Sequence, residues 1–140
     1  MENESLLFDT SYIVSFCIVN DTNHVKAKEL AEYLQTFSRK YTSNMVYAET
    51  ATVLSQRLGK KEANILLDIF CQSGVIELFV DQPIHDTCKV EYRTWKNKNV
   101  SFIDMTSAIL SRQEKIASIV SFDRHFIELG KKYGFKVIGI

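Results

Sequence analysis

Four acidic residues, Asp9, Glu49, Asp104 and Asp123, stand at positions from which a folded chain could gather them. Carboxylates that converge repel one another and raise one another's pKa, and a bound divalent cation removes this repulsion. Oxygen ligands without a cluster of cysteine or histidine favour Mg²⁺ or Mn²⁺ over zinc. Such a cation can activate water and neutralise charge on a phosphodiester. The acidic residues are therefore consistent with phosphodiester hydrolysis.

Each acid also has an ordinary structural explanation. Asp9 and Asp123 each follow an apolar run and could cap the helix that comes next. Ser101 and Asp104 have the spacing of a capping box. Glu49 lies on a helix face that reads as apolar, without Lys or Arg at i±3 or i±4, so an ion pair with a distant residue would also satisfy it. Both explanations stay open for all four acids at this point.

An alternation of strands and helices must position these acids. We predict strands at residues 5–8, 41–42, 75–80, 116–122 and 136–138, and helices at residues 11–19, 24–40, 45–58, 63–72, 83–96, 101–115 and 124–132. This order predicts an α/β protein with a parallel sheet covered on both faces. Asp9 and Asp123 then leave the same edge of the sheet, where sites form in such folds. The helix that contains Asp104 begins near that edge, because it runs antiparallel to the strand that follows it.

The composition predicts one ordinary globular domain, residues 1–140. Apolar residues make up 46% and charged residues 24%, and 17 basic residues balance 17 acidic ones, so binding to nucleic acid would depend on local patches. The three cysteines match no zinc or disulfide framework. The N-terminus is acidic, and no apolar segment is long enough to span a bilayer. We therefore expect a cytoplasmic protein with no membrane partner.

Four short motifs surround the acids, in this order: Phe8-Asp9-Thr10-Ser11, Tyr47-Ala48-Glu49, Phe102-Ile103-Asp104 and Ser121-Phe122-Asp123-Arg124-His125-Phe126. In order and spacing they resemble those of the PIN domain, and most closely those of the VapC-type toxins of bacterial and archaeal toxin–antitoxin pairs. The last motif is the most specific, since a phenylalanine three residues after a post-strand aspartate is typical of the family.

This resemblance implies a three-layer α/β/α sandwich with a central parallel sheet. It also implies an endoribonuclease that depends on Mg²⁺ or Mn²⁺. Asp9, Glu49 and Asp104 would be the core metal ligands and catalytic acids, and Asp123 the fourth, acting through metal or water. All four acids are present, which argues against a degenerate, non-catalytic member.

Other residues near the motifs receive smaller roles. Thr10 and Ser11 occupy positions where hydroxyls often assist the first aspartate of the family. Arg124 is expected to reach a phosphate or to pair with Asp123. The three histidines are isolated in sequence, and we assign no role to any of them.

The resemblance implies an RNA substrate, a cognate antitoxin and a homodimer. Residues 12–19 and the helix 24–40 could supply a surface for the antitoxin or for a second copy, although core packing explains them equally well. Two alternatives remain: a stand-alone nuclease that processes RNA, and a non-catalytic α/β binding domain of receiver type. The second requires paired acids after the first strand, but Asp9 is followed by Thr10.

Overall fold

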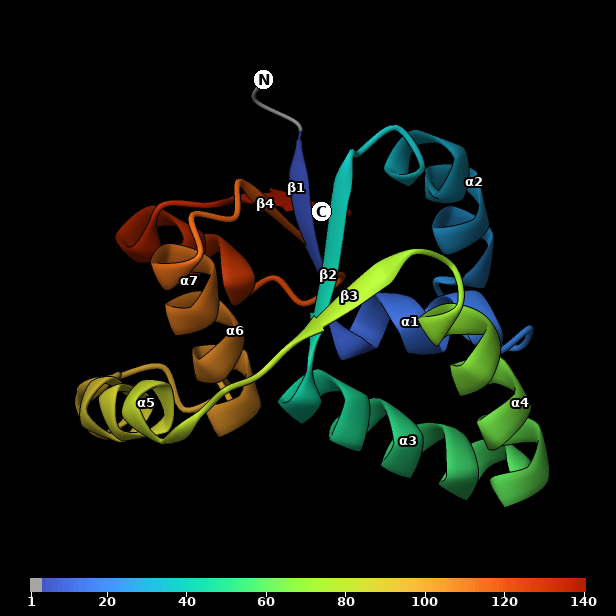
Figure 1. Ribbon diagram of the computed structural model, residues 1–140, viewed down its shortest axis with the longest axis horizontal. Helices are drawn as coiled ribbons and strands as arrows, with labels where there is room; N and C mark the ends of the chain where they lie inside the picture. The colour runs from blue at the N-terminus through green and yellow to red at the C-terminus, as the bar shows by residue number, and fades with distance from the viewer. Residues whose placement is uncertain (1–3) are drawn as a thin grey trace.

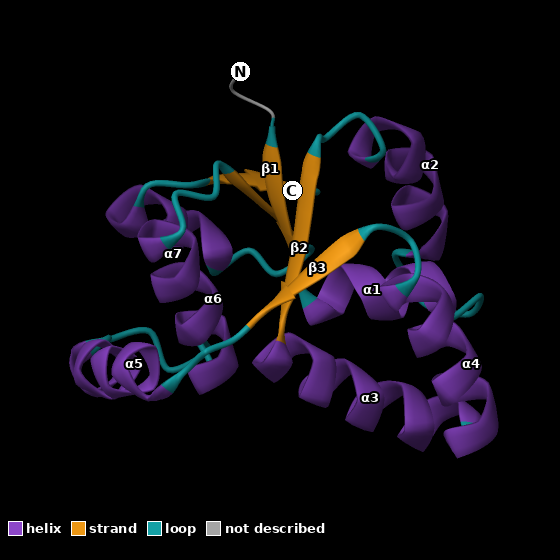
Figure 2. Ribbon diagram, in the orientation of Figure 1, coloured by secondary structure: helices purple, strands orange, loops and turns teal. Residues whose placement is uncertain are grey.

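A computed structural model describes residues 4–140 as one all-parallel sheet with helices on both faces (Figures 1 and 2). The strands are β1 (Ser5–Phe8), β2 (Arg39–Ser43), β3 (Val75–Leu78), β4 (Ser118–Val120) and β5 (Lys136–Ile138), in the spatial order β3-β2-β1-β4-β5. The helices are α1 (Thr10–Cys17), α2 (His24–Leu34), α3 (Asn44–Leu58), α4 (Lys60–Cys71), α5 (Gln82–Thr94), α6 (Phe102–Gln113) and α7 (Phe126–Tyr133). The predicted three-layer α/β/α architecture is confirmed.

The central strand β1 is buried on both faces, which explains its unbroken apolar run. Leu7 faces one layer, where it joins a core cluster with residues of α5, α6 and α7. Leu6 and Phe8 face the other layer and pack with residues of α1 and α2. Figure 1 shows the same division, with α6 and α7 on one side of the sheet and α1 and α2 on the other.

Helices α1, α3 and α6 begin at the carboxyl edge of the sheet, and each of them has a side-chain cap. Asp9 caps α1 directly after β1, and Ser43 caps α3 directly after β2 by accepting from the backbone N–H of Val46 at 3.0 Å. Ser101 caps α6 in a complete capping box with Asp104. Because an N-cap fixes where a helix starts, these caps hold the first turns of α1, α3 and α6 at one end of the sheet.

The predicted helix 24–40 is wrong in its second half. The helix α2 ends at Leu34, and the side chain of Phe37 is only 2% exposed. The backbone N–H of Arg39 donates to the carbonyl of Glu4 at 2.7 Å, which draws this segment alongside β1. The strand β2 therefore begins at Arg39, and the predicted two-residue strand 41–42 is part of a longer one.

The predicted strand 116–122 is also longer than the observed β4, which ends at Val120. The residues that follow turn toward the end of β1, where Ser121 and Ser11 meet. No helix within residues 4–140 is both long and apolar enough to cross a membrane.

Candidate metal centre

Asp9 lies at the end of β1 with its side chain almost fully buried, at 2% exposure. Its Oδ2 atom accepts three hydrogen bonds: from the backbone N–H of Ser11 at 3.2 Å, from the hydroxyl of Ser11 at 2.7 Å and from the hydroxyl of Ser121 at 2.8 Å. Asp9 is thus a helix cap, as one explanation predicted. No hydrogen bond from residues 4–140 reaches Oδ1, which leaves that oxygen for another partner.

The two serine hydroxyls connect Asp9 to the loop after β4. They lie 3.1 Å apart, and each also accepts a backbone N–H at 3.0 Å, Ser11 from Phe122 and Ser121 from Asp123. The loop that contains Asp123 is therefore fastened to Asp9 through hydroxyl groups. Ser121 had no assigned role in the sequence; its only signal was its place in the fourth motif.

Thr10 and Ser11 differ in where their hydroxyls point. The hydroxyl of Ser11 donates to Asp9, as the resemblance implied for this position. The hydroxyl of Thr10 is buried against α3, where it donates to the carbonyl of Val46 at 3.5 Å and accepts from Thr50 at 3.2 Å. Thr10 therefore fastens α1 to α3 and does not contact the carboxylate.

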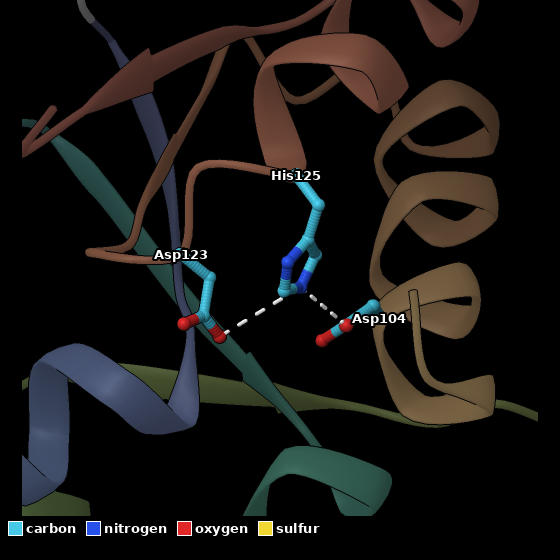
Figure 3. A group of neighbouring side chains, drawn as sticks. All are labelled: Asp104, Asp123 and His125. Atoms are coloured by element: carbon cyan, nitrogen blue, oxygen red, sulfur yellow. Dashed lines mark hydrogen bonds and ion pairs between the residues drawn. The ribbon is translucent and has the colours of Figure 1, made fainter. Parts of the chain in front are cut away.

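Asp104, Asp123 and His125 form the second part of the centre (Figure 3). The imidazole of His125 lies between the two carboxylates, with Nε2 at 2.8 Å from Oδ2 of Asp104 and 3.8 Å from Oδ2 of Asp123. Asp104 is buried in the first turn of α6, and its Oδ2 also accepts from the backbone N–H of Ser101 at 2.9 Å. One ligand atom from each of the three residues lies within 4.8 Å of the others.

His125 is a second site residue, after Ser121, to which the sequence analysis assigned no role. It is one of three isolated histidines, and its contact with Asp104 joins residues 21 apart. The feature of the sequence that could have identified His125 is its position two residues after Asp123, in a loop expected at the carboxyl edge of the sheet.

Burial and repulsion between carboxylates disfavour the ionised forms of Asp9 and Asp123. Burial raises the pKa of Asp9 to about 7, and the carboxylates of Asp104 and Asp123 add to this rise, while hydrogen bonds from Ser11 and Ser121 oppose it. Burial also raises the pKa of Asp123, with Asp104 adding to the rise and His125 opposing it. A divalent cation would offset this repulsion. The donor set, which is mainly carboxylate oxygen, fits such a cation.

Glu49 lies outside this group of contacts. The buried stripe of α3 runs through Val46, Thr50 and Leu54, and Glu49 stands beside it, partly exposed. The prediction that Glu49 lies on an apolar face is therefore only partly correct: Val46 on that face is buried, but Thr52 is exposed. In the part of the chain that the structure describes, no hydrogen bond or ion pair joins Glu49 to the other three acids.

Arg124 is exposed and forms no ion pair with Asp123 within residues 4–140. It borders an open cavity of about 460 Å³ beside the centre. The other lining residues are Asn97, Asn99, His125, Ile127 and Glu128.

Comparisons with known proteins agree with this architecture. A family model described as PIN domain matches residues 6–132. The chain is 28% identical over 131 residues to the "23S rRNA-specific endonuclease VapC20" of Mycobacterium tuberculosis. This alignment covers 89% of this chain and 94% of that protein. The crystal structure of that VapC20, described as a sarcin-ricin loop cleaving toxin, superposes with a TM-score of 0.81 at 26% identity, over 90% of this chain and 95% of that one. The structure of FitAcB from Neisseria gonorrhoeae superposes with a TM-score of 0.63 at 17% identity over 96% of both chains, a likeness of fold alone.

Proposed function

The chain belongs to the PIN domain family, and from this premise we propose that it is a single-domain endoribonuclease that hydrolyses RNA phosphodiesters with Mg²⁺ or Mn²⁺. The observation that carries the proposal is the convergence of Asp9, Asp104 and Asp123 at one edge of the sheet, where Asp104 and Asp123 add to the rise in the pKa of Asp9, and Asp104 adds to the rise in the pKa of Asp123. The likeness to VapC20, an endonuclease, supports RNA as the substrate.

We assign different roles in cation binding and positioning to the side chains of the centre. Asp9, Asp104 and Asp123 would hold the cation, and Glu49 would contribute through water. When bound, the cation supplies a water molecule of lowered pKa and neutralises charge on the phosphodiester. Ser11 and Ser121 hold the Asp9 carboxylate in one orientation, so that Oδ1 faces away from its cap.

The substrate side of the centre is formed by the residues after β4. The Asp123 side chain is 48% exposed, so RNA can approach the centre at this residue. Arg124, exposed beside it, is positioned to contact a phosphate of the RNA backbone. Cleavage of cellular RNA in the cytoplasm is the setting that we propose.

Removal of divalent cations should abolish RNA cleavage, because the ionised carboxylates alone neither activate water nor stabilise the developing charge. We expect no cleavage by the EDTA-treated protein and recovery after addition of Mn²⁺ or Mg²⁺. The measurement is gel analysis of labelled RNAs, including a sarcin-ricin loop RNA because VapC20 is described as cleaving one. Cleavage that persists in EDTA would contradict the metal requirement, and no cleavage of any RNA would favour a binding role.

We further propose that the protein is the toxin of a VapBC-type pair, and a stand-alone RNA-processing nuclease is the alternative. The supporting observation is an apolar groove of about 490 Å³ between α1, α2 and α4. The residues that line it include the apolar Phe16, Val19, Leu66, Ile69 and Phe70 and the basic Lys28 and Lys40. An antitoxin segment with apolar and acidic side chains would match this surface.

Replacement of Ile69 by glutamate should release that antitoxin segment. Ile69 is 61% exposed in the groove, and a charge there would be buried against apolar atoms on docking. We expect at least tenfold weaker copurification with the product of a neighbouring antitoxin-like reading frame, and unchanged RNA cleavage.

Ile65→Glu is the matched control, because Ile65 is 52% exposed on the same helix but does not line the groove. Equal loss in both variants would contradict the proposed docking surface. A change of oligomeric state in Ile69→Glu alone, measured by light scattering, would instead assign the groove to a homodimer.

A further inference from the structure

We propose that His125 is a nitrogen ligand of this metal centre and that the centre consequently prefers Mn²⁺ to Mg²⁺. The proposal rests on the proposed function, since it concerns the same site. The imidazole Nε2 lies 2.8 Å from Oδ2 of Asp104 and 3.8 Å from Oδ2 of Asp123 (Figure 3). Atoms that share one ion at about 2.1–2.2 Å stand roughly 3–4 Å apart. The distance from Nε2 to Asp123 falls in this range, and the shorter distance to Asp104 is that of a hydrogen bond, so a small shift of the ring would give Nε2 the spacing of a ligand.

The orientation of the His125 ring is fixed by packing. The side chain is 19% exposed, and the ring stacks on that of Phe126 with centroids 5.7 Å apart and planes 25° apart. Phe126 is fully buried as the first residue of α7, so its ring is a rigid support. A donor held in this way needs little reorganisation when an ion binds.

The tautomer required for binding is available to His125. Within residues 4–140, Nε2 is the ring nitrogen that forms the contacts with Asp104 and Asp123, and no hydrogen bond involves Nδ1. The single proton of the neutral ring can therefore reside on Nδ1 while Nε2 offers its lone pair. In the metal-free protein, Nε2–H can instead donate to Asp104.

The donor set decides the metal preference. Asp9 and Glu49, two of the expected carboxylates, are not among the residues whose ligand atoms lie together, and His125 is. Mg²⁺ prefers oxygen ligands and holds its waters tightly, whereas imidazole nitrogen suits first-row transition ions. An imidazole in place of a carboxylate therefore favours Mn²⁺ over Mg²⁺ at this site.

Electron spin-echo envelope modulation of Mn²⁺ bound to the whole chain tests the ligand directly. We expect nitrogen modulation from the wild-type protein that changes from the ¹⁴N to the ¹⁵N pattern when only histidine is labelled with ¹⁵N. His125→Gln should remove the signal, and His85→Gln should keep it, because His85 is not among the residues whose ligand atoms lie together. Absence of histidine nitrogen modulation in the wild type overturns the proposal, and this result does not depend on how any variant folds.

Calorimetric titration with each ion separates a ligand from a positioning residue. The ratio of the Mg²⁺ Kd to the Mn²⁺ Kd should fall about tenfold in His125→Gln and stay unchanged in His85→Gln. If His125 only orients Asp104 by its hydrogen bond, the affinities for both ions fall equally, which overturns the proposal.

These outcomes are distinguishable from failure of the proposed function. Histidine modulation in a protein that cleaves no RNA would overturn the nuclease and keep the ligand. RNA cleavage by a wild-type protein that shows no histidine modulation would support the nuclease and overturn the histidine ligand.

Discussion

Replacement of Asp104 by asparagine is expected to lower metal-dependent RNA cleavage about a thousandfold or more. The change removes one negative charge from the proposed centre, and charge stabilisation by a bound cation is worth several kcal/mol in a transition state. The fold should survive, because the asparagine oxygen can still accept the Ser101 N–H that completes the cap of α6. Initial rates of RNA cleavage at saturating Mn²⁺ measure the effect, and Asp9→Asn should behave in the same way.

Asp81→Asn is the matched control for these two variants. Asp81 is also a helix cap, since its Oδ1 accepts from the backbone N–H of Ile84 at 3.2 Å, but it caps α5 and is not part of the metal centre. This variant should cleave RNA at the wild-type rate. Wild-type rates in Asp104→Asn and Asp9→Asn would contradict the proposed mechanism.

Asp9→Asn should also make the metal-free protein more stable than the wild type at alkaline pH. The pKa of Asp9 rises from 3.8 to about 7 on folding, so the folded state binds this proton more tightly than the unfolded state does. The resulting stabilisation is fully present below pH 3.8 and is lost as the pH rises through about 7. A rise of this size in the pKa corresponds to at most about 4 kcal/mol in the free energy of unfolding. Because asparagine cannot ionise, the variant does not lose this part of the free energy of unfolding at alkaline pH.

Urea unfolding in EDTA at several pH values measures this difference in the free energy of unfolding. The advantage of Asp9→Asn over wild type should grow as the pH rises from about 4 to about 8, across the interval between the two pKa values. Added Mn²⁺ should stabilise the wild type more than the variant at the alkaline end, since the cation offsets the charge that the variant lacks. A pH-independent difference would show that Asp9 is not penalised by its burial.

The elements that could be predicted are those with local causes. Leu6, Leu7 and Phe8 form an unbroken apolar run, which marks a strand buried on both faces, and Asp9 directly after it is a capping residue by type. The capping box of Ser101 and Asp104 is likewise a short-range pattern, and the structure contains it. These residues were sufficient to place two of the acids, Asp9 and Asp104, at one edge of a parallel sheet.

What could not be predicted depends on contacts far along the chain. The end of α2 is set by Arg39, which bonds to Glu4 and so joins the sheet. The side of α3 that is buried is chosen by its neighbours, and a shift of one residue turns a helix face by about 100°. Glu49 therefore stands beside the buried stripe instead of on it. His125 enters the site only because the loop after β4 turns toward α6.

The pairing of β4 with β1 has a consequence for the synthesis of the protein. Asp9 and Ser121 touch across 112 residues, and Asp123 is the next acid along. A chain still being translated therefore lacks the centre until residue 123 has been added and β4 has left the ribosome to lie beside β1. If the proposed function holds, every ribosome that makes this nuclease carries an inert polypeptide at least until residue 123 has emerged, and its own RNA is not cleaved in the meantime.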